Sequence, residues 1–160
     1  MIKRELYMNR IRPFIGGELI KVMTGIRRSG KSVMLELIKE ELAEAGVAPS
    51  QMISINFEDM RYSHLQTATA LHDEIIKRAE GIEGKAYLFF DEIQEVEGWE
   101  KCVNSLRVAL DCDIYITGSN AKLLSGELAT YIGGRYVEFV IYPFSFAEFL
   151  ELYHTIAPRD

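Results

Sequence analysis

The stretch LIKVMTGIRRSGKS, residues 19–32, decides the fold of this chain. Its first six residues are mostly apolar and predict a strand over Leu19–Thr24. The strand leads directly into GIRRSGKS, which matches the pattern G-x-x-x-x-G-K-[ST] in full from Gly25 to Ser32. Apolar side chains then recur at helical spacing from Lys31 to Ala45, and Gly46 follows as a stop signal. The stretch therefore predicts a strand, a phosphate-binding loop and a helix in succession.

The residues of this loop are of the types that a polyphosphate requires. Successive backbone N–H groups must point at the phosphates, and glycine allows the dihedral angles and the close approach. Lys31 supplies a positive charge for the β- and γ-phosphates, and the Ser32 hydroxyl is a ligand for Mg²⁺ beside the N-terminus of the next helix. We expect the loop to face solvent. The residues expected to bind the nucleotide are Gly25, Ser29, Gly30, Lys31, Ser32 and Val33.

Two arginines, Arg27 and Arg28, occupy variable positions of the loop, where side chains tend to point away from the phosphates. One interpretation is solvated charge that raises the local potential for an anion. The other is contact with a partner or a neighbouring subunit. Both interpretations stay open, and neither arginine is assigned a catalytic role.

The composition is that of one ordinary globular domain. The 160 residues are 48% hydrophobic and 26% charged, with a net charge of −6. This acidic balance disfavours a protein that binds nucleic acid through bulk positive charge. The basic residues Lys3, Arg4, Arg10 and Arg12 of the first predicted helix could still touch nucleic acid, although a solvated face is the simpler interpretation.

Several features favour a cytoplasmic location without membrane contact. The first ten residues, MIKRELYMNR, are charged and lack the apolar core of a secretory signal. No apolar run approaches the roughly 18 residues that span a bilayer. Cys102 and Cys112 fit neither a disulfide framework nor a zinc pattern. We therefore expect reduced thiols.

Beyond the loop, strand-like runs alternate with helical patterns. The other predicted strands are Met52–Glu58, Ala86–Phe90, Asp113–Thr117 and Tyr136–Tyr142, and the other predicted helices are Ser63–Glu80, Trp99–Leu110, Ala121–Ile132 and Ser145–Tyr153. Met52–Glu58 alternates apolar and polar residues, which indicates a position at or near a sheet edge. Ala86–Phe90 is apolar throughout, which is typical of a strand buried on both faces. The order predicts an α/β sandwich with a mostly parallel, five-stranded central sheet.

Two acids, Asp91 and Glu92, directly follow the buried run YLFF. An aspartate at the carboxyl end of a strand beside the phosphate-binding loop can hold Mg²⁺. A glutamate after it can orient and deprotonate an attacking water. The plainer alternative is a pair of exposed acids that precede a helix N-terminus.

Two further polar positions are candidate catalytic residues. Asn120, or less favoured Ser119, follows the fourth predicted strand and could hydrogen-bond the γ-phosphate or the attacking water; the alternative is a helix cap. Arg135 follows a pair of glycines before the fifth strand. It either complements a helix C-terminus or stabilises transition-state charge on the nucleotide of a neighbouring subunit.

Together, GIRRSGKS, YLFFDEIQ, ITGSNAKLLSGELA and GGRYVEFVIYPFSFAEF resemble a bacterial and archaeal family of AAA-type ATPases, over nearly the whole chain. The resemblance implies the P-loop fold with strand order 5-1-4-3-2 and ATP as the nucleotide. It also implies Walker A roles for Lys31 and Ser32 and Walker B roles for Asp91 and Glu92. Asn120 or Ser119 takes the sensor role, and Arg135 takes the arginine-finger role, which implies a homo-oligomer.

The resemblance also sets an expectation about domain organisation. Members of this family are usually much longer, with a helical region and a nuclease-like domain after the ATPase part. Residues 1–160 are therefore expected to form an ATPase core, either cut from a longer protein before a helical lid and a C-terminal domain or naturally shortened. We expect this core to bind ATP more firmly than it hydrolyses it.

The leading functional hypothesis is an ATPase that binds Mg·ATP and passes the γ-phosphate to water, coupled to an unknown partner or to the C-terminal domain. Two alternatives are an ATP-dependent sensor or interaction module with negligible turnover and, less favoured, a small-molecule kinase. A GTPase is disfavoured, because the loop after the fourth strand lacks the N-K-x-D pattern that would read a guanine edge.

Overall fold

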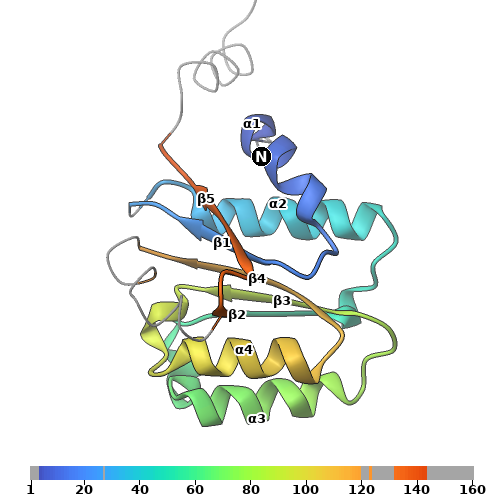
Figure 1. Cartoon of the computed structure of the whole chain (residues 1–160), viewed down its shortest axis with the longest axis vertical. Coiled ribbons are helices and arrows are strands. Elements are labelled where there is room, and N and C mark those ends of the chain that lie inside the picture. Colours follow the sequence, from blue (N-terminus) through green and yellow to red (C-terminus); the bar gives the residue numbers. More distant parts are fainter. Residues whose placement is uncertain (1–3, 27, 120–122, 124–131, 144–160) are drawn as a thin grey trace, which may run out of the picture.

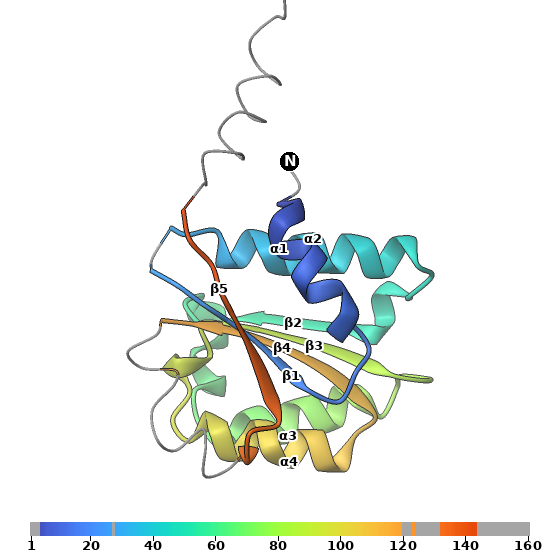
Figure 2. The ribbon, with the colours of Figure 1, turned by 45° about the horizontal axis from the view of Figure 1, so that its top comes forward.

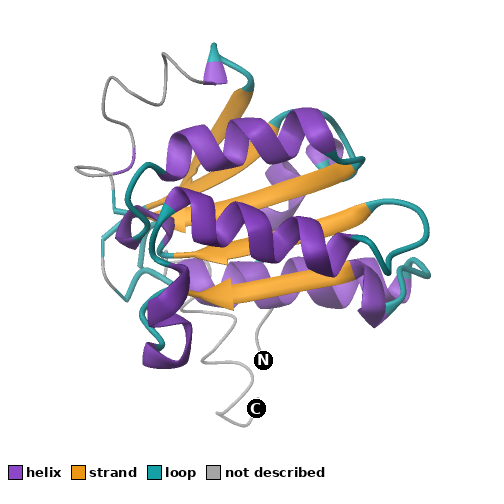
Figure 3. Ribbon diagram, turned by 90° about the horizontal axis from the view of Figure 1, so that it is seen from below, coloured by secondary structure: helices purple, strands orange, loops and turns teal. Residues whose placement is uncertain are grey.

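Five parallel strands form a single sheet in the order β2-β3-β4-β1-β5 (Figure 1). The computed structural model of the chain describes residues 4–26, 28–119, 123 and 132–143. Helices α1 and α2 cover one face of the sheet, and α3 and α4 cover the other (Figures 1 and 3). The result is a three-layer α/β sandwich.

The elements follow one another along the chain in an alternating order. The strands are β1 (Ile20–Thr24), β2 (Met52–Asn56), β3 (Ala86–Asp91), β4 (Cys112–Gly118) and β5 (Tyr136–Val140). The α-helices are α1 (Glu5–Ile11), α2 (Lys31–Glu44), α3 (Ala68–Ala79) and α4 (Trp99–Ala109), with short 3-10 turns η1 (Arg12–Phe14), η2 (Pro49–Gln51), η3 (Met60–Leu65) and η4 (Ile93–Glu95).

The predicted sheet is confirmed, and its order read from the other edge is 5-1-4-3-2. β2 lies at one edge, and its side chains alternate between buried Ile53 and Ile55 and exposed Ser54 and Asn56. Ile53 and Ile55 face the core formed with α3 and α4, whereas Ser54 and Asn56 line an open cleft beside α2. β3 is buried almost throughout, as its continuous apolar run predicts.

One predicted helix boundary is wrong. The pattern from Ser63 to Gln66 predicts a helix start, but residues 60–65 form the 3-10 turn η3 instead. The α-helix begins five residues later, where the Thr67 side chain accepts a hydrogen bond from the Ala70 N–H at 3.3 Å. Both sites have a hydroxyl residue in position to cap, and the tertiary contact of Thr67 with Glu97 selects the second. The helices predicted over residues 121–132 and 145–153 lie largely or wholly outside the described residues.

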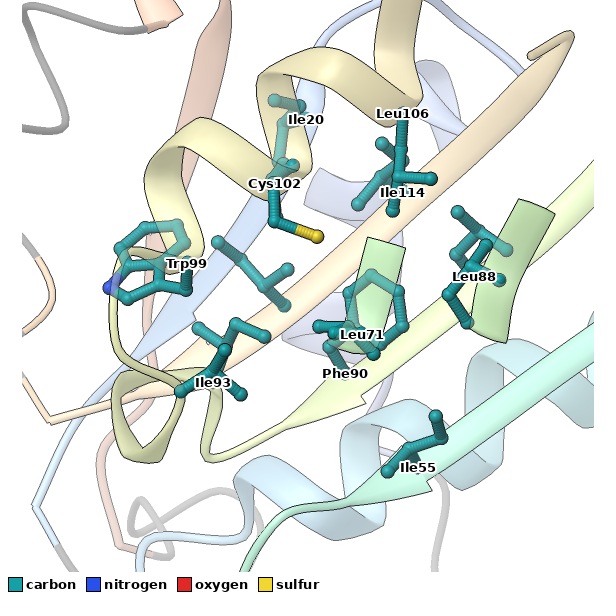
Figure 4. Packing of buried hydrophobic residues seen from close by; sticks show 14 of the residues in the cluster. Ile20, Ile55, Leu71, Leu88, Phe90, Ile93, Trp99, Cys102, Leu106 and Ile114 are labelled. Carbon is teal, nitrogen blue, oxygen red and sulfur yellow. The ribbon is translucent and has the colours of Figure 1, made fainter. Parts of the chain in front are cut away.

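Alternate residues of the strands point to opposite faces of the sheet and contribute to two separate hydrophobic cores. One core lies between the sheet and the pair α3 and α4, where Trp99, Cys102 and Leu106 of α4 meet Phe90 and Ile114 of the sheet (Figure 4). The other core lies between the sheet and the pair α1 and α2, and its residues include Met8, Ile11, Met34, Ile38, Phe89 and Tyr115. Both faces of the central strands are therefore closed to water. Within the described residues no helix is long and apolar enough to cross a bilayer.

A fully buried ion pair crosses the amino-terminal end of the sheet. The Lys21 ammonium of β1 contacts the Asp113 carboxylate of β4, and neither side chain is exposed. Asp113 also accepts from the Gly16 N–H at 2.8 Å and from the Tyr115 hydroxyl, while Lys21 donates to the Gly17 carbonyl at 2.9 Å. Burial and the charge of Asp113 raise the pKa of Tyr115, so its hydroxyl remains a donor. The network ties residues 16–17 to the two central strands.

The basic residues of the first helix do not form a common solvated face. Arg12 binds Glu41 of α2 and Glu5, with its Nη2 2.6 Å from Glu41 Oε1. Arg4 is buried, which contradicts a solvated role for it, and Arg10 is exposed. Lys3 lies outside the described residues. The alternative of a contact with nucleic acid, which was the less favoured interpretation, therefore loses Arg4 and Arg12 of its four residues.

Both thiols are expected to react slowly in the folded protein. Burial raises the pKa of Cys102 to about 12 and that of Cys112 to about 11. Because the thiolate is the reactive form, labelling by an aromatic disulfide reagent at pH 8 should be roughly 100-fold slower than in the urea-unfolded chain. Stopped-flow absorbance measures both rates. Equal rates in the folded and unfolded chain would contradict the packing of α4 against the sheet.

Candidate nucleotide-binding site

The loop after β1 and the residues after β3 and β4 meet at the carboxyl end of the sheet (Figure 2). Parallel pairing brings them together, because β1 pairs with β4 and β4 pairs with β3, all in the same direction. Ligands of open α/β sheets bind in the crevice outside the carboxyl ends of the strands. This end of the sheet is therefore the candidate site.

The two glycines of the loop meet strict spatial requirements. Gly25 has φ +152°, and a Cβ there would lie 2.2 Å from the Ile141 carbonyl oxygen. Gly30 has φ +99°, in the left-handed region, and is the N-cap of α2. The N–H groups of the first turn of α2 have no acceptor within the helix. They remain available for an anion, as the sequence pattern predicts.

Lys31 is buried, which corrects the expectation that its charge faces solvent, although Ile26 and Arg28 of the same loop are exposed. It is 5% exposed, and its ammonium donates to the Gly25 carbonyl at 2.7 Å. The same ammonium lies 3.6 Å from Glu92 Oε1. The lysine therefore spans the loop and the end of β3, and its charge is directed into the site rather than toward bulk water.

Ser32 and Asp91 are in direct contact although 59 residues separate them. The Ser32 hydroxyl donates to Asp91 Oδ2 at 2.6 Å. Ser32 is exposed, whereas the aspartate is 8% exposed. A hydroxyl and a carboxylate are both hard oxygen ligands of the kind that Mg²⁺ prefers, with water completing its octahedron. This pair therefore fits a magnesium ion held together with a nucleotide.

Thr117 holds both acids in place, and the sequence alone did not single it out. Its fully buried hydroxyl donates to Asp91 Oδ1 and accepts the backbone N–H of Glu92 at 2.9 Å. The only signal in the sequence was the position of a small polar residue at the end of the fourth strand, next to the residues chosen as candidates. Thr117 is therefore a positioning residue for the acids that follow β3.

The backbone at Glu92 turns sharply out of β3. Glu92 has φ 57° and ψ 51°, a left-handed conformation that is uncommon for a residue other than glycine. Its side chain is 15% exposed and accepts from Gln94 Nε2 at 2.6 Å. Such backbone conformations cluster at functional sites, where the surrounding contacts maintain them. The turn directs the carboxylate toward Lys31.

A cleft of about 290 Å³ opens beside Ser32 and Asp91, between α2 and the end of β2. Val33, which was expected to bind the nucleotide, lines this cleft and is 39% exposed. The other lining residues are Leu35, Glu36, Lys39, Ser54 and Asn56. The cleft gives the pair of oxygen ligands access to solvent.

The buried hydroxyl of Ser29 adds an independent observation about the loop. Its Oγ is buried and has no hydrogen-bond partner among the described residues. Buried polar atoms in folded proteins normally have partners, so an orphaned hydroxyl within a phosphate-binding loop is consistent with a bound anion. The residues present thus fit a magnesium-bound polyphosphate.

Several candidate positions remain without a structural test. Asn120 and Arg27 lie outside the described residues. Ser119 is half-buried after β4, and its carbonyl accepts from the Leu123 N–H at 2.9 Å, the spacing of a helix start. Arg28 is exposed with φ 63°, and both of its interpretations stay open.

Arg135 is not brought to the site within one chain. Its carbonyl accepts from the N–H of Ile20, the first residue of β1, and the phosphate-binding loop follows the last residue of that strand. The first and last residues of this strand, Ile20 and Thr24, are four steps and therefore roughly 13 Å apart at about 3.3 Å per residue. Because Arg135 lies at the opposite end of β1 from the loop and is exposed, the contact with a nucleotide expected for it would be made to a second chain.

Comparison with known proteins identifies the family of the chain. The AAA domain family matches residues 17–150. An uncharacterised protein of Haemophilus influenzae is 48% identical over 150 residues, which are 94% of this chain and 38% of that protein. An uncharacterised protein of Methanocaldococcus jannaschii is 41% identical over 133 residues, 82% of this chain and 28% of that protein. The chain thus spans well under half the length of these curated relatives.

Solved structures share the fold. A cryo-EM reconstruction of closed-state Hsp104 with ATPγS and FITC-casein matches with a TM-score of 0.65 at 16% identity, over 98% of this chain and 30% of that one. A DNA polymerase III gamma subunit-related protein of Thermotoga maritima matches with a TM-score of 0.63 at 12% identity, over 91% of this chain and 48% of that one. Identities this low establish the fold alone. Taken with the family match over most of its length, they show that the chain belongs to the AAA domain family and has the fold of a nucleotide-binding, ATPase-type module.

Proposed function

We propose that the chain binds Mg·ATP at the carboxyl end of its sheet and hydrolyses it. One observation carries this proposal: the loop after β1 and the acids after β3 are joined by two contacts, Ser32 with Asp91 and Lys31 with Glu92. A cation for the phosphates, oxygen ligands for a metal and a carboxylate near both are the parts that phosphoryl transfer requires. The AAA domain match supports ATP as the nucleotide.

In this proposal each residue has a separate task. The amides at the start of α2 and the Lys31 ammonium bind the β- and γ-phosphates. Ser32 and Asp91 hold Mg²⁺, which when bound neutralises charge that develops on the phosphates. Glu92 takes a proton from the attacking water, and Thr117 keeps both acids in register. Asn120 or Ser119 is proposed to sense the γ-phosphate.

A sensor with negligible turnover is the second candidate, and one observation favours it. The Glu92 carboxylate is engaged on both oxygens, by the Lys31 ammonium and by the Gln94 amide. It must leave these partners before it can activate water. A protein in which binding does not release it would change shape with ATP and hardly hydrolyse it.

The fate of the γ-phosphate separates these candidates. The full-length protein is incubated with ATP labelled at the γ-phosphate, and the products are resolved by chromatography. Hydrolysis predicts label in free phosphate, and the sensor predicts label that remains in bound ATP. Label transferred to a metabolite would favour a kinase, which otherwise lacks support, because Glu92 directly after Asp91 is placed to activate water.

Arg135 is proposed to act on the nucleotide of a neighbouring copy, so a mixture of two inactive variants should regain activity. Arg135→Ala supplies an intact Glu92, and Glu92→Gln supplies an intact Arg135. We expect the mixture to release phosphate at a rate above that of either variant alone, as measured by a coupled assay. No rescue in demonstrated oligomers would assign Arg135 to the end of the preceding helix instead.

The greater length of the curated relatives supports the further proposal that residues 1–160 are an ATPase core that drives another domain or partner.

A further inference from the structure

The side chain of Arg4, just before α1, is buried against the phosphate-binding loop. It is 3% exposed, and its Nη1 donates to the Ser29 carbonyl at 2.6 Å. A Cβ added at Gly30 would lie only 2.7 Å from the same nitrogen, so the guanidinium packs closely against this glycine. A guanidinium thus sits directly behind the last two residues of the loop before Lys31.

The second arm of the same guanidinium reaches the segment after β5. Arg4 Nη2 donates to the Tyr142 carbonyl at 2.6 Å, and 138 residues separate the two. The Tyr142 N–H in turn donates to the Tyr7 hydroxyl at 3.0 Å, and the Arg4 guanidinium lies 4.6 Å from the centre of the Tyr7 ring. Two residues of one short segment therefore hold both backbone groups of Tyr142.

The contact with Ser29 bears on how the loop binds an anion. If the N–H groups of a loop face a phosphate, its carbonyls must face the other way, and a buried carbonyl needs a donor. A charged guanidinium is a strong donor, and its planar fork can serve two carbonyls at once. A lysine has a single point charge and cannot reproduce that bridge.

We propose that Arg4 is a positioning residue that bridges the phosphate-binding loop to the segment after β5, so that nucleotide binding and the position of Tyr142 are linked. The proposal rests on the proposed function, because it assumes that the loop binds ATP. It predicts that loss of the bridge weakens binding without removing any group that touches the nucleotide. It also predicts that ATP tightens the backbone at Tyr142.

The test compares Arg4→Ala, Arg4→Lys and wild type in the full-length protein, with Arg10→Ala as the matched control. Arg10 lies in α1, the helix that Arg4 precedes, and is exposed, so its substitution removes an equal charge without touching the loop. Affinity for Mg·ATP is measured by calorimetry at a temperature where circular dichroism shows each variant folded. Hydrogen exchange of the peptide that contains Tyr142 is measured with and without ATP.

We expect affinity to fall about tenfold in both Arg4 variants and to stay within about twofold in Arg10→Ala, since hydrogen bonds to charged groups have effects of that order. ATP should slow exchange at Tyr142 in wild type and not in Arg4→Lys, which keeps the buried charge and therefore serves as the test variant if the alanine variant does not fold. Wild-type affinity in Arg4→Lys, or equal protection of Tyr142 in both proteins, would overturn the bridge. If the wild-type protein binds no ATP, that result would instead contradict the proposed function itself.

Discussion

Glu92→Gln is expected to lower the rate of phosphate release by about 10²- to 10⁴-fold, the range that general-base catalysis contributes. Glutamine keeps the size of the side chain and can still contact Gln94 and the loop, but it cannot accept a proton from water. The Glu92 backbone N–H keeps its bond to Thr117, so the turn after β3 should be unchanged. Affinity for Mg·ATP should therefore remain within a few fold of wild type.

A neighbouring glutamate provides the control for this substitution. Glu95 lies three residues further on, at the end of η4, and is exposed. Glu95→Gln removes the same charge from the same turn and should leave phosphate release unchanged. Equal, slow phosphate release by wild type and Glu92→Gln, with ATP bound by both, would reject the ATPase and favour the sensor.

Asp113→Ala is expected to destabilise the folded chain by about 3–5 kcal/mol, because it leaves the Lys21 ammonium buried without its counter-charge. The substitution also leaves the Tyr115 hydroxyl and the Gly16 N–H without the carboxylate to which both donate. Urea unfolding followed by the fluorescence of Trp99, the single tryptophan, measures the free energy of unfolding.

An aspartate two residues away makes the comparison direct. Asp111 pairs with Lys85 at 3.2 Å, but its side chain is 71% exposed, so Asp111→Ala should cost less than about 1 kcal/mol. Replacing both members of the buried pair, Lys21→Met with Asp113→Leu, should recover most of the stability, because no charge is then left buried. A loss in Asp113→Ala no larger than that in Asp111→Ala would contradict the buried network.

The parts of the fold that depend on local sequence could be predicted. The unit of strand, loop and helix from Leu19 to Ala45 follows from a short motif and from helical spacing, and β1 and α2 differ from it by one residue at an end. The apolar run before Asp91 shows by itself that the strand is buried. The strand order came from the family resemblance, since periodicity does not specify which strands pair.

The contacts that position the site are long-range and could not be read from the sequence. Arg4 meets Ser29 across 25 residues, Thr117 meets Asp91 across 26, and Lys21 meets Asp113 across 92. In each case the residue type alone suggests another role: a solvated arginine, a small strand residue or an edge charge. Only the tertiary fold shows that these side chains are buried and paired. The same limit explains why the sequence pattern predicts a helix start at Ser63, whereas Thr67 caps the helix beside a tertiary contact with Glu97.

The most direct test of this account is calorimetric titration of the full-length protein with Mg·ATP, beside Lys31→Met. Methionine keeps an unbranched apolar side chain at this buried position and removes only the ammonium. The account predicts saturable binding by wild type and about 100-fold weaker binding by the variant, a difference of about 2.7 kcal/mol. Circular dichroism should show both proteins folded. Absence of binding heat in wild type over several temperatures, or equal affinity in the two proteins, would contradict the claim that this loop and its lysine hold a nucleoside triphosphate.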